Sequence, residues 1–188
     1  MKSVLVCDDE PIIRMSLKNK LQELGFDEIL ECGDGEAAVK LALSRLPDIV
    51  ILDVAMPKKD GITAAKEIRS KLKVPVMFLT AGSDPETVSR ARQAGVAAFL
   101  LKPFREQDLW PAIEMAFAHN DEIENLKEQL EDLKETLESR KVIEKAKGIL
   151  MQTQHLSEPE AFRKMQKLAM DKRKSLRQIA EAILLTEG

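Results

Sequence analysis

Apolar residues form four short runs along the chain, and each run ends on a polar side chain. The runs are rich in β-branched residues and alternate with stretches of helical periodicity, a pattern typical of buried strands in a parallel sheet. These runs are Val4–Cys7 followed by Asp8 and Asp9, Ile49–Leu52 followed by Asp53, Val76–Leu79 followed by Thr80, and Val96–Leu101 followed by Lys102. Ligands of parallel sheets bind beyond the carboxyl ends of the strands. We therefore expect three carboxylates, a hydroxyl and an ammonium group to converge on one edge.

Residues 1–118 place helical stretches between these runs, so strand and helix alternate along the chain. The first helix is expected from near Pro11 to Gly25, and Ile29 and Leu30 form a short second strand. The later helices are expected from Asp34-Gly35-Glu36 to about Leu46, from Gly61 to Leu72, and from the capping box Ser83-Asp84-Pro85-Glu86 to Gly95. Repeated strand–helix units with short loops predict a doubly wound α/β domain with right-handed crossovers.

A fifth helix is predicted from near Arg105 to about Gln152, which corresponds to about 70 Å without a stop signal. Pro111 lies near its start and is a candidate for a kink. Its middle has apolar residues at alternating spacings of three and four, namely Ile123, Leu126, Leu130, Leu133 and Leu137. This seam could pack on its own domain, but no nearby apolar segment is available to cover it. The pattern therefore favours a coiled coil between two copies of the chain.

The C-terminal residues predict two more helices. Ser157-Glu158-Pro159-Glu160 is a second capping box, and Phe162, Met165, Leu168 and Ala169 follow on one helix face. Ser175 is expected to cap a last helix that carries Leu176, Ile179, Ile183 and Leu184. The tail is thus predicted to be a small three-helix unit whose first helix is the end of the long one. Phe162, Met151, Met165 and Met170 are expected in its core.

Charge is distributed unevenly along the 188 residues, whose net charge is −3. Residues 1–118 carry −2, residues 119–139 carry −6 and residues 140–188 carry +5. A basic cluster of this kind is the electrostatic footprint of a phosphate-backbone binder, although a solvated helix face would look similar. The split supports three segments: an α/β domain at 1–118, a coiled-coil linker at 119–139 and an output unit at 140–188.

Two further features restrict where the protein acts. No run reaches the length of a membrane span and no signal peptide begins the chain, so no membrane partner and a cytoplasmic location are expected. Cys7 and Cys32 lack metal-ligand spacing and are expected to be reduced core thiols.

The polar strand ends form a candidate phosphoryl site. Asp8 and Asp9 are suited to hold Mg²⁺, which takes oxygen ligands and is usually bound through carboxylates, water and phosphate. A carboxylate beside such a cation can attack a phosphoryl group and form an acyl phosphate. Asp53 stands alone at its strand end and is the best nucleophile, while Lys102 would neutralise charge on the transferring oxygens. Each residue alone could instead be a helix cap or a surface group, but four such strand ends together favour the shared site.

These residues carry a resemblance to a known family. Asp8-Asp9-Glu10-Pro11, Asp53 to Gly61, Leu79-Thr80-Ala81 and Lys102-Pro103-Phe104 resemble the motifs of the receiver domain of two-component response regulators. The resemblance implies a flavodoxin-like five-stranded fold, phosphorylation of Asp53 by a sensor histidine kinase, and Mg²⁺ held by Asp8, Asp9, Asp53 and the Ala55 carbonyl. It also implies a cis Lys102-Pro103 bond, movement of Thr80 onto the phosphate and an inward swing of Phe99, a position often occupied by tyrosine.

The tail carries a second resemblance. Residues 137–151, and the later stretches 160–162, 168–173 and 179–181, resemble an ANTAR domain, which with the coiled coil would span about 124–188. This resemblance implies a transcription antiterminator that dimerises when phosphorylated and binds paired stem-loops with six-base loops in nascent RNA. The RNA-contacting residues are expected to be Arg140, Lys141, Lys145, Ala146, Lys147, Gly148, Lys172 and Arg173. Ala146 and Gly148 would leave a shallow place beside Lys147 where a base could approach.

Two other outputs remain open. A small basic helical unit after a receiver domain could bind DNA, but the last helix is largely apolar and the basic residues lie mostly on the earlier helices. A phosphorelay intermediate without a nucleic-acid role is disfavoured by the basic tail. Residues 140–188 offer no nucleophile–base pair and are short for an enzyme domain, so we expect no enzymatic output.

Overall fold

The computed structural model describes all residues except 1, 82–88, 91–93, 97 and 188. The chain divides into two compact units, Met1–Asn125 and Leu126–Gly188.

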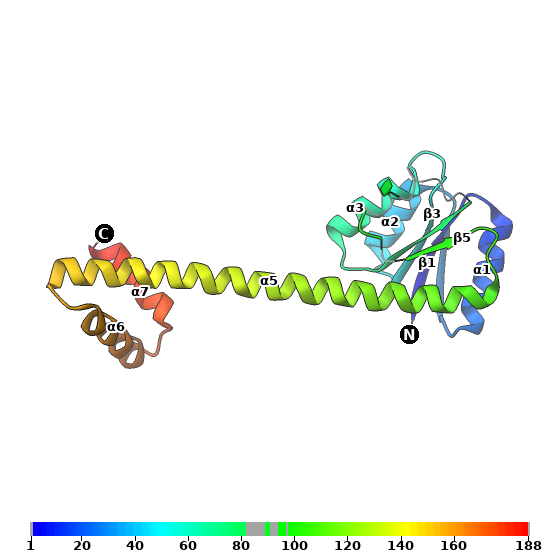
Figure 1. Ribbon diagram of the computed structural model, residues 1–188. Helices are drawn as coiled ribbons and strands as arrows, with labels where there is room; N and C mark the ends of the chain where they lie inside the picture. The colour runs from blue at the N-terminus through cyan, green and yellow to red at the C-terminus, as the bar shows by residue number, and fades with distance from the viewer. Residues whose placement is uncertain (1, 82–88, 91–93, 97, 188) are drawn as a thin grey trace. The chain divides into compact units, whose positions relative to one another are not determined.

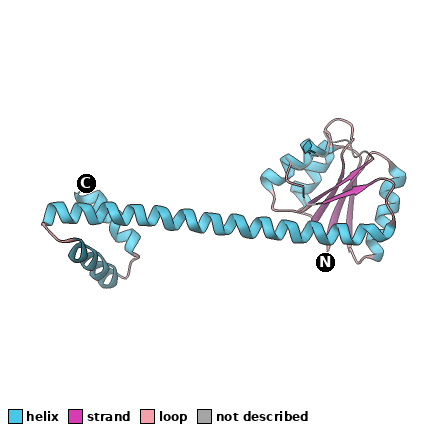
Figure 2. Ribbon diagram, in the orientation of Figure 1, coloured by secondary structure: helices cyan, strands magenta, loops and turns pink. Residues whose placement is uncertain are grey.

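The first unit is built on a sheet of five parallel strands (Figure 2). The strands are β1 (Ser3–Cys7), β2 (Glu28–Cys32), β3 (Ile49–Asp53), β4 (Val76–Thr80) and β5 (Ala98–Leu101). Their order is β2-β1-β3-β4-β5, the order of flavodoxin-like doubly wound folds. The order reverses direction between β1 and β3, so the crevice beyond their carboxyl ends is the expected ligand site. The fold class predicted for this part of the chain is confirmed.

Helices cover both faces of the sheet (Figure 1). On one face, Val4, Val6, Ile49 and Ile51 pack against α1 (Pro11–Glu23) and the start of α5 (Glu106–Gln154). On the other face, Leu5, Val50 and Leu52 pack against α2 (Gly35–Arg45) and α3 (Gly61–Lys71). Because both faces are covered, successive residues of a central strand are buried whichever face they point to. This explains why β1, β3 and β4 are continuous apolar runs in the sequence.

Two aspartates begin helices at the edge where the strands end. Asp34 accepts a hydrogen bond from the backbone N–H of Ala37 at 2.9 Å at the start of α2, and Asp60 accepts one from Thr63 at 2.9 Å at the start of α3. These caps satisfy amide groups that have no partner within the helix. The helix expected from Ser83 to Gly95 falls mostly on residues outside the described part of the chain.

The expectation that Cys7 and Cys32 are free thiols is wrong. They are the last residues of the neighbouring strands β1 and β2, where they form a register pair. Their Cα atoms lie 4.8 Å apart, and a disulfide joins them. Sequence spacing did not indicate this pair because the two strands become neighbours only in the folded sheet.

The second unit consists of the C-terminal part of α5 with α6 (Glu158–Lys172) and α7 (Leu176–Glu187). Its fully or nearly fully buried core residues come from all three helices: Ala146, Leu150, Ala161, Met165, Ile179, Ala180 and Ile183. The Ser175 hydroxyl accepts a hydrogen bond from the N–H of Gln178 at 3.2 Å, and the Ser157 N–H donates to the Glu160 carboxylate at 2.9 Å. The predicted three-helix unit and its helix starts are confirmed.

Two residues expected in this core lie at the surface instead. Met165 is buried, but Met170 is 79% exposed and Phe162 is 37% exposed. Both residues are on α6, whose inward face is formed by Ala161, Met165, Leu168 and Ala169. Phe162 is adjacent to Ala161 in sequence, and a step of one residue turns a side chain about 100° around a helix.

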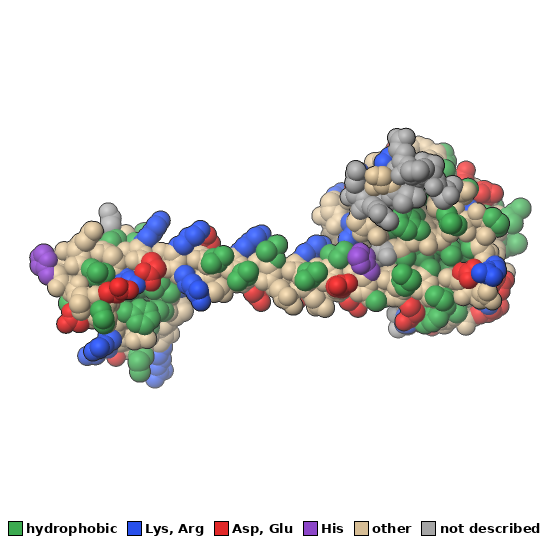
Figure 3. All heavy atoms as spheres, viewed as in Figure 1, with side chains coloured by type: hydrophobic (Ala, Val, Ile, Leu, Met, Phe, Trp, Pro, Cys, Tyr) green, Lys and Arg blue, Asp and Glu red, His purple; other side chains and the backbone are tan. Residues whose placement is uncertain are grey.

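The apolar seam of α5 is exposed. Leu126, Leu130, Leu133 and Leu137 are each about half exposed, and hydrophobic side chains lie between charged ones along the middle of this helix (Figure 3). Ile123 lies at the end of the first unit and is half-buried. α5 contains 49 residues and continues through Pro111. Among the described helices, none is apolar over a stretch long enough to cross a bilayer.

Candidate functional site

Two of the polar strand ends, Asp8 and Asp53, meet at the ammonium group of Lys102. Lys102 Nζ lies 2.6 Å from Asp8 Oδ2 and 3.2 Å from Asp53 Oδ2. It also lies 3.6 Å from Glu10 Oε1. Thr80 ends the neighbouring strand β4, and its carbonyl accepts a hydrogen bond from the backbone N–H of Lys102 at 2.8 Å. The structure thus brings together the residues that the strand pattern predicted.

Most of this cluster is shielded from solvent, whereas Glu10 is exposed. Asp8 is fully buried, and Asp53 and Thr80 are nearly so. Burial raises the pKa of the Asp53 carboxyl, Lys102 partly opposes this, and the nearby charge of Asp8 raises it further, so the pKa stands above its ordinary value. Burial alone would lower the pKa of the Lys102 ammonium, but hydrogen bonds and charges from Asp8 and Asp53 outweigh burial and raise it. Lys102 is therefore held as a cation between two carboxylates.

Carboxylates at the end of β1 form a candidate cation site. Oxygen atoms of Asp8, Asp9 and Glu10 all lie within 4.8 Å of one another. Oxygen ligands of this kind suit Mg²⁺, so the donor set fits the ion predicted from the sequence. Glu10 follows the two predicted ligands, and the sequence did not predict that it lies close to both Asp8 and Lys102. Its position directly after Asp9 in the motif could have indicated it as a further ligand. Ala55 lies two residues after Asp53 in the loop, and its backbone N–H hydrogen-bonds to the Asp53 carboxylate.

Close backbone approaches fix the loop that follows Asp53. Gly61, the first residue of α3, donates its N–H to the carbonyl of Val54 at 3.0 Å. A Cβ atom on Gly61 would lie 1.9 Å from the Asp53 carbonyl oxygen, and one on Gly35 would lie 2.1 Å from the carbonyl oxygen of Lys59. Only glycine permits these approaches. Lys58, whose φ is 62°, further ties the loop to α2 through an ion pair with Asp34 at 2.8 Å.

The remaining predicted receiver residues also have defined places. The Lys102-Pro103 peptide bond is cis, as the motif implied. Phe99 lies on β5 with 38% of its surface exposed, and its ring centroid is 6.5 Å from that of Phe78. In this structure the Phe99 side chain is therefore at the surface rather than swung inward. Phe78 is fully buried beneath it.

The basic residues among the predicted RNA contacts differ in their exposure and in their partners. Arg140, Lys145, Lys172 and Arg173 are exposed and make no ion pair within the described residues, whereas Lys141 pairs with Glu138 at 2.7 Å. Lys147 is nearly buried, and its ammonium lies 2.6 Å from Glu144 and 2.8 Å from Glu158. These two carboxylates raise the pKa of Lys147. Its described contacts thus join α5 to the start of α6.

Ala146 does not offer the surface that the sequence suggested. Its side chain is fully buried in the core of the second unit. The small size of Ala146 is therefore explained by packing against α6 and α7, and a base cannot approach it without unfolding that core. Gly148 is only partly buried, and a Cβ built on it would meet nothing within 4 Å. Of the two small residues beside Lys147 where a base was predicted to approach the helix, only Gly148 is accessible.

Comparison with known proteins assigns both units. Residues 4–114 match the response regulator receiver domain family and residues 131–184 match the ANTAR domain family. The chain belongs to the response regulators, and it combines a receiver domain with a C-terminal ANTAR domain. Transcriptional regulatory protein PdtaR of Mycobacterium tuberculosis is 46% identical over 187 residues, which cover 100% of this chain and 91% of that protein.

Several other similar proteins match a part of the chain about as long as the first unit. The probable C4-dicarboxylate response regulator DctR of Bacillus subtilis is 38% identical over 123 residues, covering 64% of this chain and 54% of that protein. The receiver domain of the response regulator NarL from Mycobacterium tuberculosis superposes with a TM-score of 0.57 at 34% identity, covering 61% of this chain and 95% of that one. Chemotaxis response regulator CheY4 of Vibrio cholerae gives 0.58 at 31% identity, covering 62% and 98%. These matches agree with the receiver fold of the first unit.

Proposed function

We propose that the chain is a phosphorylation-activated antiterminator whose input is the phosphorylation of Asp53 by a histidine kinase. The observation that supports this most is the buried Asp8–Lys102–Asp53 cluster at the carboxyl edge of the sheet. Oδ2 of Asp53 attacks phosphorus, and the bond from phosphorus to the donor nitrogen breaks. Lys102 is placed to neutralise the phosphoryl oxygens, while Asp8, Asp9 and Glu10 would hold Mg²⁺. Bound Mg²⁺ supplies further positive charge to the same oxygens. The site serves as a switch rather than as a turnover enzyme.

Labelling tests this input directly. Purified protein is incubated with acetyl phosphate and Mg²⁺, and the acyl phosphate is measured by intact mass. Asp53→Ala should abolish the mass increase, whereas Asp132→Ala, which removes an exposed aspartate of the second unit, should leave it unchanged. Undiminished labelling of Asp53→Ala would contradict the assignment.

RNA is the proposed target of the second unit. The match to the ANTAR family and the exposed cations Arg140, Lys145, Lys172 and Arg173 support this output. RNA loops present unstacked bases and phosphates that such side chains can bind. The competing DNA-binding function needs a polar recognition helix, but α7 buries Ile179, Ala180 and Ile183 and its Arg177 pairs with Glu181 at 2.9 Å. Stem-loop RNA with six-base loops should therefore bind more tightly than duplex DNA, and the affinity should fall steeply with salt. Equal affinity for both, or a flat salt dependence, would argue against this output.

Pairing of the exposed α5 seam is the proposed link between input and output. Half-exposed leucines at heptad spacing gain stability when a second helix covers them. Two linked ANTAR units could then bind two stem-loops of one RNA, and the overall affinity would rise because the second binding event is intramolecular. Sedimentation of phosphorylated protein should show a dimer that Leu130→Lys abolishes, and Glu131→Lys on the neighbouring position is the matched control. A dimer that is equally stable without phosphorylation would refute the coupling.

A further inference from the structure

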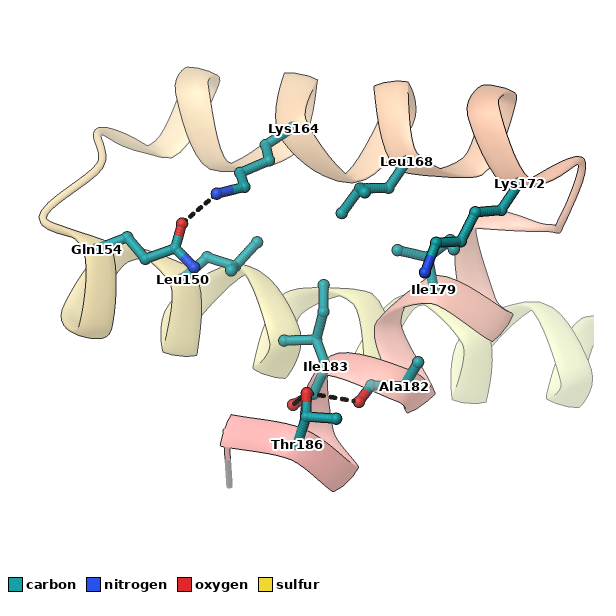
Figure 4. A pocket seen from close by; sticks show the side chains of 9 residues that line it. All are labelled: Leu150, Gln154, Lys164, Leu168, Lys172, Ile179, Ala182, Ile183 and Thr186. Carbon is teal, nitrogen blue, oxygen red and sulfur yellow. Dashed lines mark hydrogen bonds between the residues drawn. The ribbon is translucent and has the colours of Figure 1, made fainter.

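The second unit contains a cavity of about 320 Å³ between the end of α5, α6 and α7. Its floor is apolar and is formed by Leu150, Leu168, Ile179 and Ile183 (Figure 4). Leu150, Ile179 and Ile183 belong to the buried core of the unit, so the floor is anchored by packing. The volume is near the lower end of that of small-molecule sites, so the occupant must be a small group.

Two lysines of α6 flank this apolar floor. Lys164 and Lys172 are eight residues apart, which places them on the same side of the helix about 12 Å apart, with Leu168 between them (Figure 4). The Lys164 ammonium donates a hydrogen bond to the Gln154 side chain. Neither lysine forms an ion pair within the described residues, in contrast to Lys141 and Lys147 of the same unit. The cavity is thus an apolar depression with a cation on either side.

We propose that this cavity receives one unstacked base of the bound RNA loop, while Lys164 and Lys172 hold the phosphates on either side of that nucleotide. This inference rests on the proposed RNA-binding function and assigns one subsite to it. A fatty acid or other single-headed anion would use only one of the two cations. A nucleotide within a strand, by contrast, has a flat apolar face between two negative charges, which matches the arrangement of floor and rim. Gln154 and Thr186 are polar residues that also line the cavity; Gln154 accepts the hydrogen bond from Lys164, and the Thr186 hydroxyl donates to the carbonyls of Ala182 and Ile183.

Abasic scanning tests the subsite. Paired hairpins with randomised six-base loops are first selected on the full-length phosphorylated protein, and each loop base of the tightest binder is then removed in turn. Loss of one base should weaken binding by about 10- to 100-fold, the usual effect of losing one specific base contact. Lys164→Ala and Lys172→Ala should each reduce the slope of log affinity against log salt by about one phosphate contact.

A filled cavity provides the matched test. Ala182 lines the cavity and is exposed, so Ala182→Phe should occupy the space without removing a core side chain. Leu185→Phe is the control because Leu185 is 87% exposed on the same helix and does not line the cavity. Ala182→Phe should bind the selected RNA about 10- to 100-fold more weakly. It should also lose its sensitivity to the critical abasic position, while Leu185→Phe should behave as wild type.

The outcomes separate the subsite from the function. Wild-type affinity of Ala182→Phe, or an abasic loss that is equally large in that variant, would overturn the subsite while leaving RNA binding intact. Failure of the wild-type protein to enrich any hairpin would overturn both proposals. A further measurement needs no variant: 2-aminopurine is placed at each loop position and its quenching by acrylamide is measured with wild-type protein. One position should become protected on binding, and protection of none would also overturn the subsite.

Discussion

A methyl group at Gly61 should damage both the stability of the first unit and its phosphorylation. The added Cβ would lie 1.9 Å from the carbonyl oxygen and 2.9 Å from the carbonyl carbon of Asp53. Carbon–oxygen contacts are normally about 3.3–3.6 Å even when they are favourable. Gly61→Ala therefore requires a displacement of about 1.5 Å. Because both contacted atoms belong to the backbone, no rotation of a side chain can relieve the contact.

The size of both effects follows from this displacement. Overpacking of a closely packed site costs about 1–3 kcal/mol of unfolding free energy, partly offset by the helical preference of alanine over glycine. Misplacement of a reacting group by about 1 Å can reduce a rate by about 100-fold. We therefore expect Gly61→Ala to be less stable than wild type by about 1–2 kcal/mol. Labelling by acetyl phosphate should be about 10- to 100-fold slower.

Two measurements check the prediction. Urea unfolding can be followed by Trp110, the one tryptophan of the chain, which is partly buried in the first unit. Acetyl phosphate is the appropriate donor because a small molecule does not depend on the docking of a kinase. Gly148→Ala is the control, since a Cβ there meets nothing within 4 Å and it lies in the second unit. Wild-type stability together with a wild-type labelling rate in Gly61→Ala would refute the argument from backbone contact.

Three further predictions concern other parts of the molecule. Gly148→Ala should stabilise the second unit by about 0.5–1 kcal/mol, measured by hydrogen exchange of α5 amides, yet weaken RNA binding; unchanged RNA affinity would remove Gly148 from the interface. Folding raises the pKa of the Asp53 carboxyl from 3.8, so the folded state binds its proton more tightly than the unfolded state does. The protonated carboxyl therefore favours folding at a pH below 3.8, and this contribution is lost as the pH rises through the folded pKa. Asp53→Asn should therefore be more stable than wild type in urea at pH 7, and a clear loss of stability would contradict the direction of the pKa. The Cys7–Cys32 disulfide joins residues 25 apart, and its reduction should lower the unfolding free energy by about 3–4 kcal/mol; alkylation of both thiols in untreated protein would show that the bond is absent.

The first unit was predictable because its chemistry lies at strand ends. A buried parallel strand has a recognisable sequence, and its carboxyl end has a fixed place in the fold. Asp8, Asp53 and Lys102 could therefore be grouped although they are far apart along the chain. The same reasoning gave no information on the disulfide, because it did not place Cys7 beside Cys32 in adjacent strands.

The second unit was less predictable because its basic residues have several possible partners. Lys147 belongs to a cluster of cations in the sequence, but its ion pair with Glu158 forms only when α6 packs beside α5. Ala146 has a small side chain that could serve either a ligand or a core, and the structure shows the core. The cavity between α5, α6 and α7 arises from three helices together, so helical periodicity alone gave no sign of it.

Lys102 contacts the predicted phosphorylation site through its side chain and the neighbouring strand β4 through its backbone. Its ammonium contacts both Asp8 and Asp53, and its N–H donates to the carbonyl of Thr80. Phosphorylation would add a charge of about −1.5 to −2 beside this cation and so draw it away from Asp8. Such a movement would act directly on β4 and β5, because Thr80 ends one strand and Lys102 follows the other. α5 belongs to both units, since it contributes Leu109 and Ile113 to the first core and Ala146 and Leu150 to the second, and we propose it as the path of the output.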